Sequence, residues 1–156
     1  MDNPKTTRRD FCGHAISFVT VASLMEACGG SGNPGGPSGG GNVPQLTQVG
    51  GTTSGNTVTV NIDAASPLNS VGGAALVQSG NSSFLAARVA QDTINVFTAI
   101  CTHEQRIVTG FSSATFVCPC HGSQYNTSGA VVQGPAPQRL RQFNSQLTNN
   151  VLTFTL

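Results

Sequence analysis

Short runs of alternating apolar and polar residues, separated by turn-forming residues, constrain this chain more than any other feature. The stretch TVTVNI would bring Val58, Val60 and Ile62 to one face of a strand. Near the C-terminus, QLTNNVLTFTL places Asn149 and Asn150 between two alternating runs. Because asparagine tolerates a positive φ, this pair predicts a hairpin turn. The pattern predicts an all-β fold.

Further short runs lie between these two segments. AALVQ and SFLAARVA flank the turn-like SGNS at 79–82 and predict another hairpin, and TINVFTAI leads directly into Cys101. RIVTGF, at 106–111, and ATFVC are the next predicted strands, and the second ends at Cys118. Many short strands at close spacing favour an antiparallel β-sandwich or barrel, with both cysteine-bearing loops at strand ends.

Length and charge narrow the class of protein. The chain has 156 residues, which is enough for one ordinary domain with a core but not for two. Charged residues make up 8% of the chain and the net charge is +1, so there is no basic footprint for nucleic acid. We therefore expect one folded domain and no nucleic-acid partner.

Residues 1–28 have the order of an export signal. The stretch TRRDFC carries Arg8 and Arg9 ahead of the apolar run GHAISFVTVASLM, which is a twin-arginine pattern. This run is too short and too interrupted for a comfortable membrane span, which needs about 20 apolar residues. A basic start with a chance Arg-Arg pair is the plainer alternative.

The end of the signal segment, LMEAC, resembles a bacterial lipoprotein cleavage box. Cleavage before Cys28 would leave a lipidated N-terminus, and the alternatives are ordinary cleavage nearby or an uncleaved anchor. Residues 29–44 are rich in Gly, Pro and Ser with almost no apolar content, which predicts a flexible tether. Residues 45–156 would then form the folded domain, held in the periplasm or at the outer face of a membrane.

The two cysteine-bearing loops each pair a thiol with an imidazole. The chain has three histidines, and since His14 lies in the signal segment, His103 and His121 remain. They occur as Cys101-x-His103 and Cys118-x-x-His121. Thiolates and imidazoles suit zinc or iron–sulfur centres. The set fits Cys₂His₂ zinc, although not in the order of common zinc fingers, or a two-iron, two-sulfide cluster with the cysteines on one iron and the histidines on the other.

The residues and spacing of these two motifs resemble those of the Rieske iron–sulfur proteins. CTH and CPCHGS match the two boxes of the family, and a tyrosine, Tyr125, follows two places after Ser123. The resemblance covers roughly residues 57–156. It implies one [2Fe-2S] cluster in a Rieske-type antiparallel β-sandwich with a small cluster-binding subdomain of two loops. The segment that resembles the proline loop of the family is Gly134, Pro135, Ala136 and Pro137.

The resemblance also implies a role for each matching side chain. Cys101 and Cys118 would hold an inner iron, and the two histidines would hold an outer iron near the surface. Ser123 and Tyr125 would donate hydrogen bonds to a bridging sulfide and to a cysteine sulfur, which would stabilise the reduced, more negative state. A turn serine and a core aromatic are the plainer roles for these two residues.

The first box departs from the family. It reads CTHEQR, where high-potential members usually read Cys-Thr-His-Leu-Gly-Cys. Arg106 stands at the position of the cysteine that would bridge the middle cysteine of CPCH, here Cys120, so the sequence does not supply that disulfide. Glu104 and Gln105 replace the leucine and glycine. In cytochrome bc-type complexes that leucine lies on the docking surface for the quinol site, so a carboxylate there indicates a polar partner.

These features predict a one-electron carrier that is exported folded and tethered to the outer face of a bacterial membrane, and that is not catalytic alone. Its partner would be a cytochrome c-like acceptor or a larger oxidoreductase, as in arsenite oxidase. The alternatives are the iron–sulfur subunit of a quinol-oxidising cytochrome bc-type complex, a ferredoxin for a ring-hydroxylating oxygenase, and a zinc-binding module.

Overall fold

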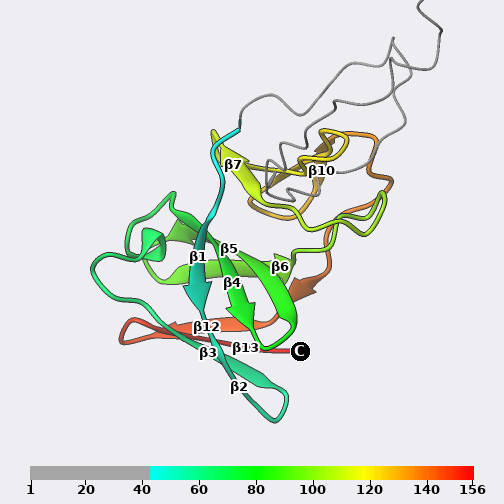
Figure 1. Ribbon diagram of the computed structural model, residues 1–156. Coiled ribbons are helices and arrows are strands. Elements are labelled where there is room, and N and C mark those ends of the chain that lie inside the picture. Colours follow the sequence, from blue (N-terminus) through cyan, green and yellow to red (C-terminus); the bar gives the residue numbers. More distant parts are fainter. Residues whose placement is uncertain (1–42) are drawn as a thin grey trace, which may run out of the picture. The chain divides into compact units, whose positions relative to one another are not determined.

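The computed structural model describes residues 43–156, and Figure 1 shows their arrangement. The predicted export segment, with Cys28, and nearly all of the predicted tether lie outside the described residues. Within 43–156 the regular structure is thirteen strands and one 3-10 helix, which confirms the all-β prediction. No helix in this described part is long and apolar enough to cross a membrane.

The largest sheet has five strands in the order β1-β4-β5-β6-β11, of which Figure 1 labels the first four. β4 and β5 form the predicted hairpin around 79–82. β1 pairs with β4 in parallel, an exception to the antiparallel pairing elsewhere among the described strands. A parallel pair needs a long crossover. Strands β2 (Thr52–Ser54) and β3 (Thr57–Asn61) with the 3-10 helix η1 (Pro67–Asn69) supply it. The strands are β1 (Thr47–Gly50), β4 (Ala74–Ser79), β5 (Ser82–Ala90), β6 (Thr93–Thr98) and β11 (Gln142–Phe143).

A four-stranded sheet in the order β12-β13-β3-β2 packs on one face of the largest sheet. Val58 and Val60 on β3 are fully buried and Ile62 is 4% exposed, as their alternation predicts. Asn149 and Asn150 both adopt positive φ between β12 and β13, so the predicted hairpin is confirmed. The strands are β2 (Thr52–Ser54), β3 (Thr57–Asn61), β12 (Ser145–Thr148) and β13 (Val151–Thr155).

The other face of the largest sheet is covered as well. Along β4, Ala74 and Leu76 belong to one buried cluster, whereas Ala75 and Val77 belong to the other. A strand that is buried on both faces carries apolar residues on both, so its sequence does not alternate between apolar and polar residues. This explains why AALVQ and SFLAARVA read as nearly continuous apolar runs.

A second four-stranded sheet, in the order β10-β9-β8-β7, carries the second cysteine-bearing loop between β8 and β9, and the first loop leads into this sheet from β6. The predicted strand at 106–111 is wrong at its start, because β7 begins only at Gly110. The preceding residues are engaged differently: Ile107 forms an isolated bridge with Ile100. The cluster-binding subdomain therefore has a sheet of its own beneath its two loops. Its strands are β7 (Gly110–Ser112), β8 (Thr115–Val117), β9 (Gln124–Asn126) and β10 (Val131–Gln133).

Gly73, directly before β4, has no room for a side chain. A Cβ at this position would lie 1.8 Å from the carbonyl oxygen of Pro67, in the backbone of η1. We expect Gly73→Ala to lower the free energy of unfolding by about 2 kcal/mol or more, because the clash is with backbone. Urea denaturation measures this, with Gly50→Ala as the control, since a Cβ at Gly50 meets nothing within 4 Å. Equal midpoints for the two variants would contradict the expectation.

Candidate metal centre

The first loop, residues 101–106, follows β6 and folds back on itself in a tight turn. The Cys101 N–H donates to the Arg106 carbonyl at 2.8 Å, and the Gln105 N–H donates to the Cys101 carbonyl at 2.9 Å. Gln105 adopts a φ of 56° to close the turn. These bonds keep Cys101 at the base of the loop while His103 is exposed near its tip.

The second loop, residues 118–123, joins β8 to β9 in a similar way. The Cys118 N–H donates to the Ser123 carbonyl at 2.9 Å, and the Gly122 N–H donates to the Cys118 carbonyl at 3.0 Å. Gly122 has a φ of 72°, a left-handed conformation that favours glycine. The loop therefore keeps Cys118 and Ser123 buried and leaves His121 exposed.

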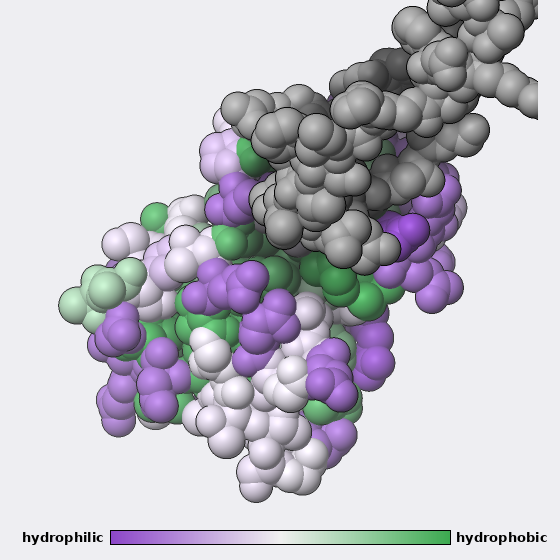
Figure 2. Space-filling view, viewed as in Figure 1, coloured by the Kyte–Doolittle hydropathy of each residue, from purple (hydrophilic) through white to green (hydrophobic). Residues whose placement is uncertain are grey.

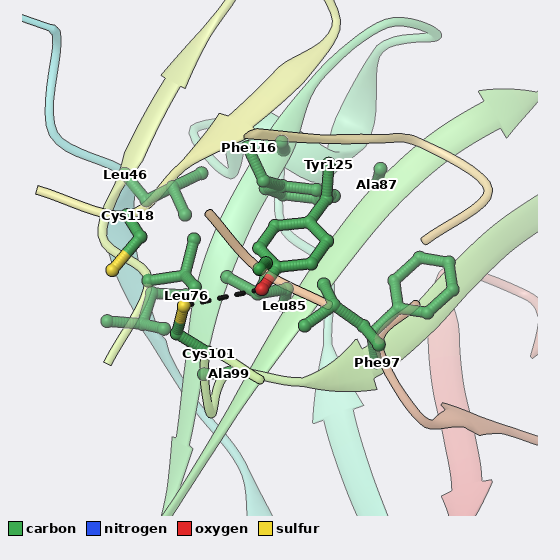
Figure 3. Close-up of a cluster of buried hydrophobic side chains, with 14 residues drawn as sticks. Leu46, Leu76, Leu85, Ala87, Phe97, Ala99, Cys101, Phe116, Cys118 and Tyr125 are labelled. Carbon is green, nitrogen blue, oxygen red and sulfur yellow. Dashed lines mark hydrogen bonds between the residues drawn. The ribbon is translucent and has the colours of Figure 1, made fainter. Parts of the chain in front are cut away.

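The two loop-base thiols are buried together. Cys101 is 1% exposed and Cys118 is 2% exposed, and Figure 3 shows both in the same group of side chains as Tyr125. Burial raises the pKa of Cys118, and the neighbouring Cys101 raises it further. Burial also acts to raise the pKa of Cys101, but hydrogen bonds, led by the one from Tyr125, outweigh it and hold that pKa below its usual value. The surroundings thus favour thiolate at Cys101 first.

Tyr125 connects this buried end of the site to the first loop. It is fully buried, and its hydroxyl oxygen lies 3.3 Å from the Cys101 Sγ (Figure 3). The Thr102 N–H donates to the same hydroxyl at 3.1 Å, which leaves the tyrosine proton to be donated onward. Burial and the neighbouring Cys101 raise the pKa of Tyr125, so the phenol keeps that proton at neutral pH. The sequence-based reasoning missed Thr102, although it is the middle residue of CTH.

Ser123 accepts a hydrogen bond from the segment that resembles a proline loop. The Ala136 N–H donates to the Ser123 Oγ at 3.1 Å, and both residues are buried. The flanking Pro135 and Pro137 are exposed. Ser123 also contributes a hydrogen bond that lowers the pKa of Cys101, after the larger influences of burial, which raises it, and of Tyr125. The hydroxyl therefore lies between the predicted proline loop and a thiol.

Two imidazoles meet at the exposed end of the site. The ring centroids of His103 and His121 are 4.9 Å apart, with the ring planes at 89°. Glu104 joins them: its Oε2 lies 3.6 Å from the His121 Nδ1, and the three side chains offer ligand atoms within 4.8 Å of one another. The sequence indicated that Glu104 is unusual but not that it reaches across to the second loop.

The donor set fits the group that the motifs predict. The two thiols lie in one buried group of side chains, and the two imidazoles lie beside each other at the surface, each on the same loop as one of the thiols. The described residues hold no disulfide, in line with the arginine at the bridging position. Soft thiolates with borderline imidazoles suit either zinc or a two-iron cluster with mixed ligands.

A family model described as Rieske [2Fe-2S] domain matches residues 59–144. These residues include both loops, the tyrosine and the segment 134–137, and they make up more than half of the chain.

Individual relatives point the same way. The chain is 40% identical over 117 residues to the cytochrome b6-f complex iron-sulfur subunit of Prochlorococcus marinus (strain MIT 9303), which covers 69% of this chain and 64% of that protein. It is 45% identical over 58 residues to the subunit of the same name from Cyanothece sp. (strain PCC 7425 / ATCC 29141), which covers 36% of this chain and 32% of the relative. The chain thus spans between about a third and two thirds of these relatives.

A solved structure of naphthalene 1,2-dioxygenase with indole bound has a TM-score of 0.53 at 16% identity, over 64% of this chain and 26% of that one. At this identity the likeness concerns the fold alone. Together with the matched motifs and the geometry of the two loops, the family match shows that the chain belongs to the Rieske [2Fe-2S] domain family, whose cofactor is one two-iron, two-sulfide cluster.

Proposed function

We propose that this domain is a one-electron carrier in which Cys101 and Cys118 hold one iron of the cluster and His103 and His121 hold the other. The observation that carries the proposal is that the two buried thiols stand on the same two short loops as the two exposed imidazoles, whose ring centroids are 4.9 Å apart. When bound, such a cluster supplies reversible one-electron chemistry at about −150 to +300 mV.

Other side chains of this chain shield and position the proposed cluster ligands. Burial of the two cysteines excludes water from the sulfur ligands, and the hydroxyl of Tyr125 supplies a hydrogen bond to one of them. The exposed histidines leave one edge of the site open to a partner. Thr102 holds the tyrosine hydroxyl in place while its own Oγ1 donates to the Gln138 carbonyl at 2.7 Å.

The test is EPR spectroscopy of the dithionite-reduced protein, with its midpoint potential and its iron and sulfide content. A Rieske-type signal with two irons and two sulfides per chain is expected. Stoichiometric zinc and no signal would instead mean a Cys₂His₂ zinc module. A potential near the upper part of the range would separate respiratory behaviour from that of an oxygenase donor.

We propose further that the carrier works with a membrane redox complex. Relatives named cytochrome b6-f complex iron-sulfur subunit support this. The exposed carboxylate of Glu104 beside His121 favours instead a polar partner, such as a cytochrome c-like acceptor or the large subunit of an oxidoreductase. Affinity purification of the tagged protein from its own membranes would distinguish these: co-purifying b-type haem supports the complex, and its absence together with a c-type haem supports the other partner.

For residues 1–44 we propose export by the twin-arginine route, lipidation at Cys28, and a flexible tether over 29–44. The sequence order of Arg8-Arg9, the apolar run and the Gly-rich segment supports this arrangement. Mass spectrometry of the membrane fraction provides the test. A mature chain that begins at an unmodified Cys28, or at another residue, would refute the lipid anchor.

Glu104 should lower the reduction potential. Its carboxylate lies beside His121, and a negative charge there disfavours the addition of an electron. We expect Glu104→Gln to raise the midpoint potential by about 20 mV at low ionic strength and by less at high ionic strength, because the group is exposed. Protein-film voltammetry at two salt concentrations measures both shifts. A fall in potential would contradict the expectation.

A further inference from the structure

The positive charges of the described residues are unevenly distributed. Four arginines are the only Lys or Arg residues between positions 43 and 156. Arg88 is buried and donates to the carbonyl oxygens of Leu68, Asn69 and Gln91, so its role is structural. The other three are exposed, and all belong to the first loop or to the segment that packs beside it.

These exposed arginines are Arg106, Arg139 and Arg141, and the last two line a groove of about 660 Å³. One wall of the groove is the end of β6 with Cys101 and Thr102, and the other is the segment 138–142. Two hydrogen bonds hold the walls together. The Thr98 N–H donates to the Arg141 carbonyl at 2.9 Å, and the Thr102 Oγ1 donates to the Gln138 carbonyl.

Both groove arginines are held in place. An Arg139 Nη2 donates to the Ser128 carbonyl at 2.9 Å, and the Arg141 Cζ lies 4.7 Å from the centre of the Phe143 ring. A guanidinium has five N–H donors, so each of these contacts leaves most of them for another partner. Side chains that are held in advance lose less entropy when they bind.

The carboxylates of the described chain do not neutralise this groove. Asp63 and Asp92 lie in other loops, and Asp92 precedes β6, whose length separates it from the groove by roughly 20 Å. Glu104 is paired with His121. Among residues 43–156, no ion pair joins a carboxylate to any of the three exposed arginines.

Exposed apolar side chains also occur on the described surface. The exposed large apolar side chains include Ile100, which lines the groove, and its bridge partner Ile107. Figure 2 shows hydrophobic residues beside hydrophilic and near-neutral ones on one face. Positive charge is the feature that distinguishes the groove. Charged surfaces steer association and select partners of the opposite sign.

We propose that this groove is a docking surface for a redox protein whose contact face is acidic. The inference rests on the proposed function, because Cys101 lies in the groove wall and docking there brings the partner against the loop that would hold the cluster. The exposed His103 lies near the tip of that loop, and His121 lies on the second loop. The arginine groove selects the partner by charge.

The test compares two forms of one probe: cytochrome c, which is basic, and the same protein with its lysines succinylated, which is acidic. Titration calorimetry of the complete protein as purified, at about 10 mM ionic strength, where the Debye length is about 30 Å, measures binding without relying on electron transfer. The acidic form is expected to bind and the basic form is not. Arg139→Gln and Arg141→Gln should each weaken binding about three- to tenfold, and Arg139→Lys and Arg141→Lys should largely restore it.

A matched control separates the groove from net charge. Asn61→Asp lowers the net charge by the same amount as each Arg→Gln change. Asn61 is exposed on β3 and pairs with Val151, beside the 149–150 turn of the other sheet. Affinity should change less than twofold in this control. An equal loss in the control, equal binding of both cytochrome forms, or unchanged affinity in both Arg→Gln variants would overturn the proposal.

Free succinate provides the last arm. If it alone binds and displaces the probe at submillimolar concentration, the groove is a site for small carboxylates and the docking proposal fails. The outcomes remain distinct from those of the proposed function. A Rieske-type EPR signal without binding overturns the docking surface alone, whereas charge-selective binding without that signal overturns the electron-carrier function alone.

Discussion

Replacing Cys118 by serine is expected to abolish the cluster. An alcohol at this position binds iron far less well than a thiolate, and the site is too deeply buried for water or another donor to take its place. Cys101→Ser should have the same effect. Visible absorption, iron content and EPR of the purified variants measure the loss, which should exceed about 90%.

Cys120→Ser is the matched control, because this cysteine lies in the same loop but outside the two family motifs' ligand positions. We expect it to retain the cluster. Circular dichroism tests whether a variant loses the cofactor only because it has unfolded. The apolar core between the largest sheet and β12-β13-β3-β2 contains no cysteine, so the strands around that core should persist in all three variants. Full cluster content in Cys118→Ser would refute the ligand assignment.

Tyr125→Phe is expected to lower the midpoint potential by about 40 mV. The tyrosine hydroxyl lies 3.3 Å from the Cys101 Sγ, and a donor there stabilises the more negative, reduced state. A hydrogen bond contributes about 1 kcal/mol, which corresponds to about 40 mV for one electron. Ser123→Ala should also lower the potential, since its hydroxyl acts on the same thiol. Voltammetry of the cluster-loaded variants gives both shifts.

Thr102→Val is the control for this pair. It removes an Oγ1 that lies 3.2 Å from the tyrosine hydroxyl but keeps the Thr102 backbone N–H contact and Tyr125 itself. A smaller shift is expected, because the direct donor to sulfur remains. If Tyr125→Phe and Ser123→Ala both leave the potential unchanged, these residues act only in packing. The idea that they tune the potential then fails.

Local signals carried most of what the sequence predicted. The Asn149-Asn150 turn and the hairpin at 79–82 depend on a few neighbouring residues, so they could be read directly. Cys101 and Cys118 could be grouped because their motif is specific, not because periodicity brings them together. The parallel pairing of β1 with β4 could not be read, since it depends on where distant strands pack.

In the first loop, too, contacts that the local sequence pattern does not encode decide the structure. RIVTGF has the alternation of a strand, yet the chain at Arg106 bonds back to Cys101, and the strand begins only at Gly110. Here the tight turn at Gln105 overrides the local propensity. The contact between Glu104 and His121 depends on the juxtaposition of two loops, which no pattern within one loop encodes.

The two buried clusters on opposite faces of the largest sheet bear on the order of assembly. The buried side chains on the loop side of the sheet include Cys101, Cys118 and Tyr125, so binding of the cofactor and packing of the core are coupled there. The buried side chains on the other face of the sheet include no predicted ligand. The sandwich can therefore form first and stay closed while the loop-bearing sheet opens as a separate cooperative unit to receive iron and sulfide. Amide hydrogen exchange would then protect β3 and β13 in the cluster-free protein while β8 and β9 exchange.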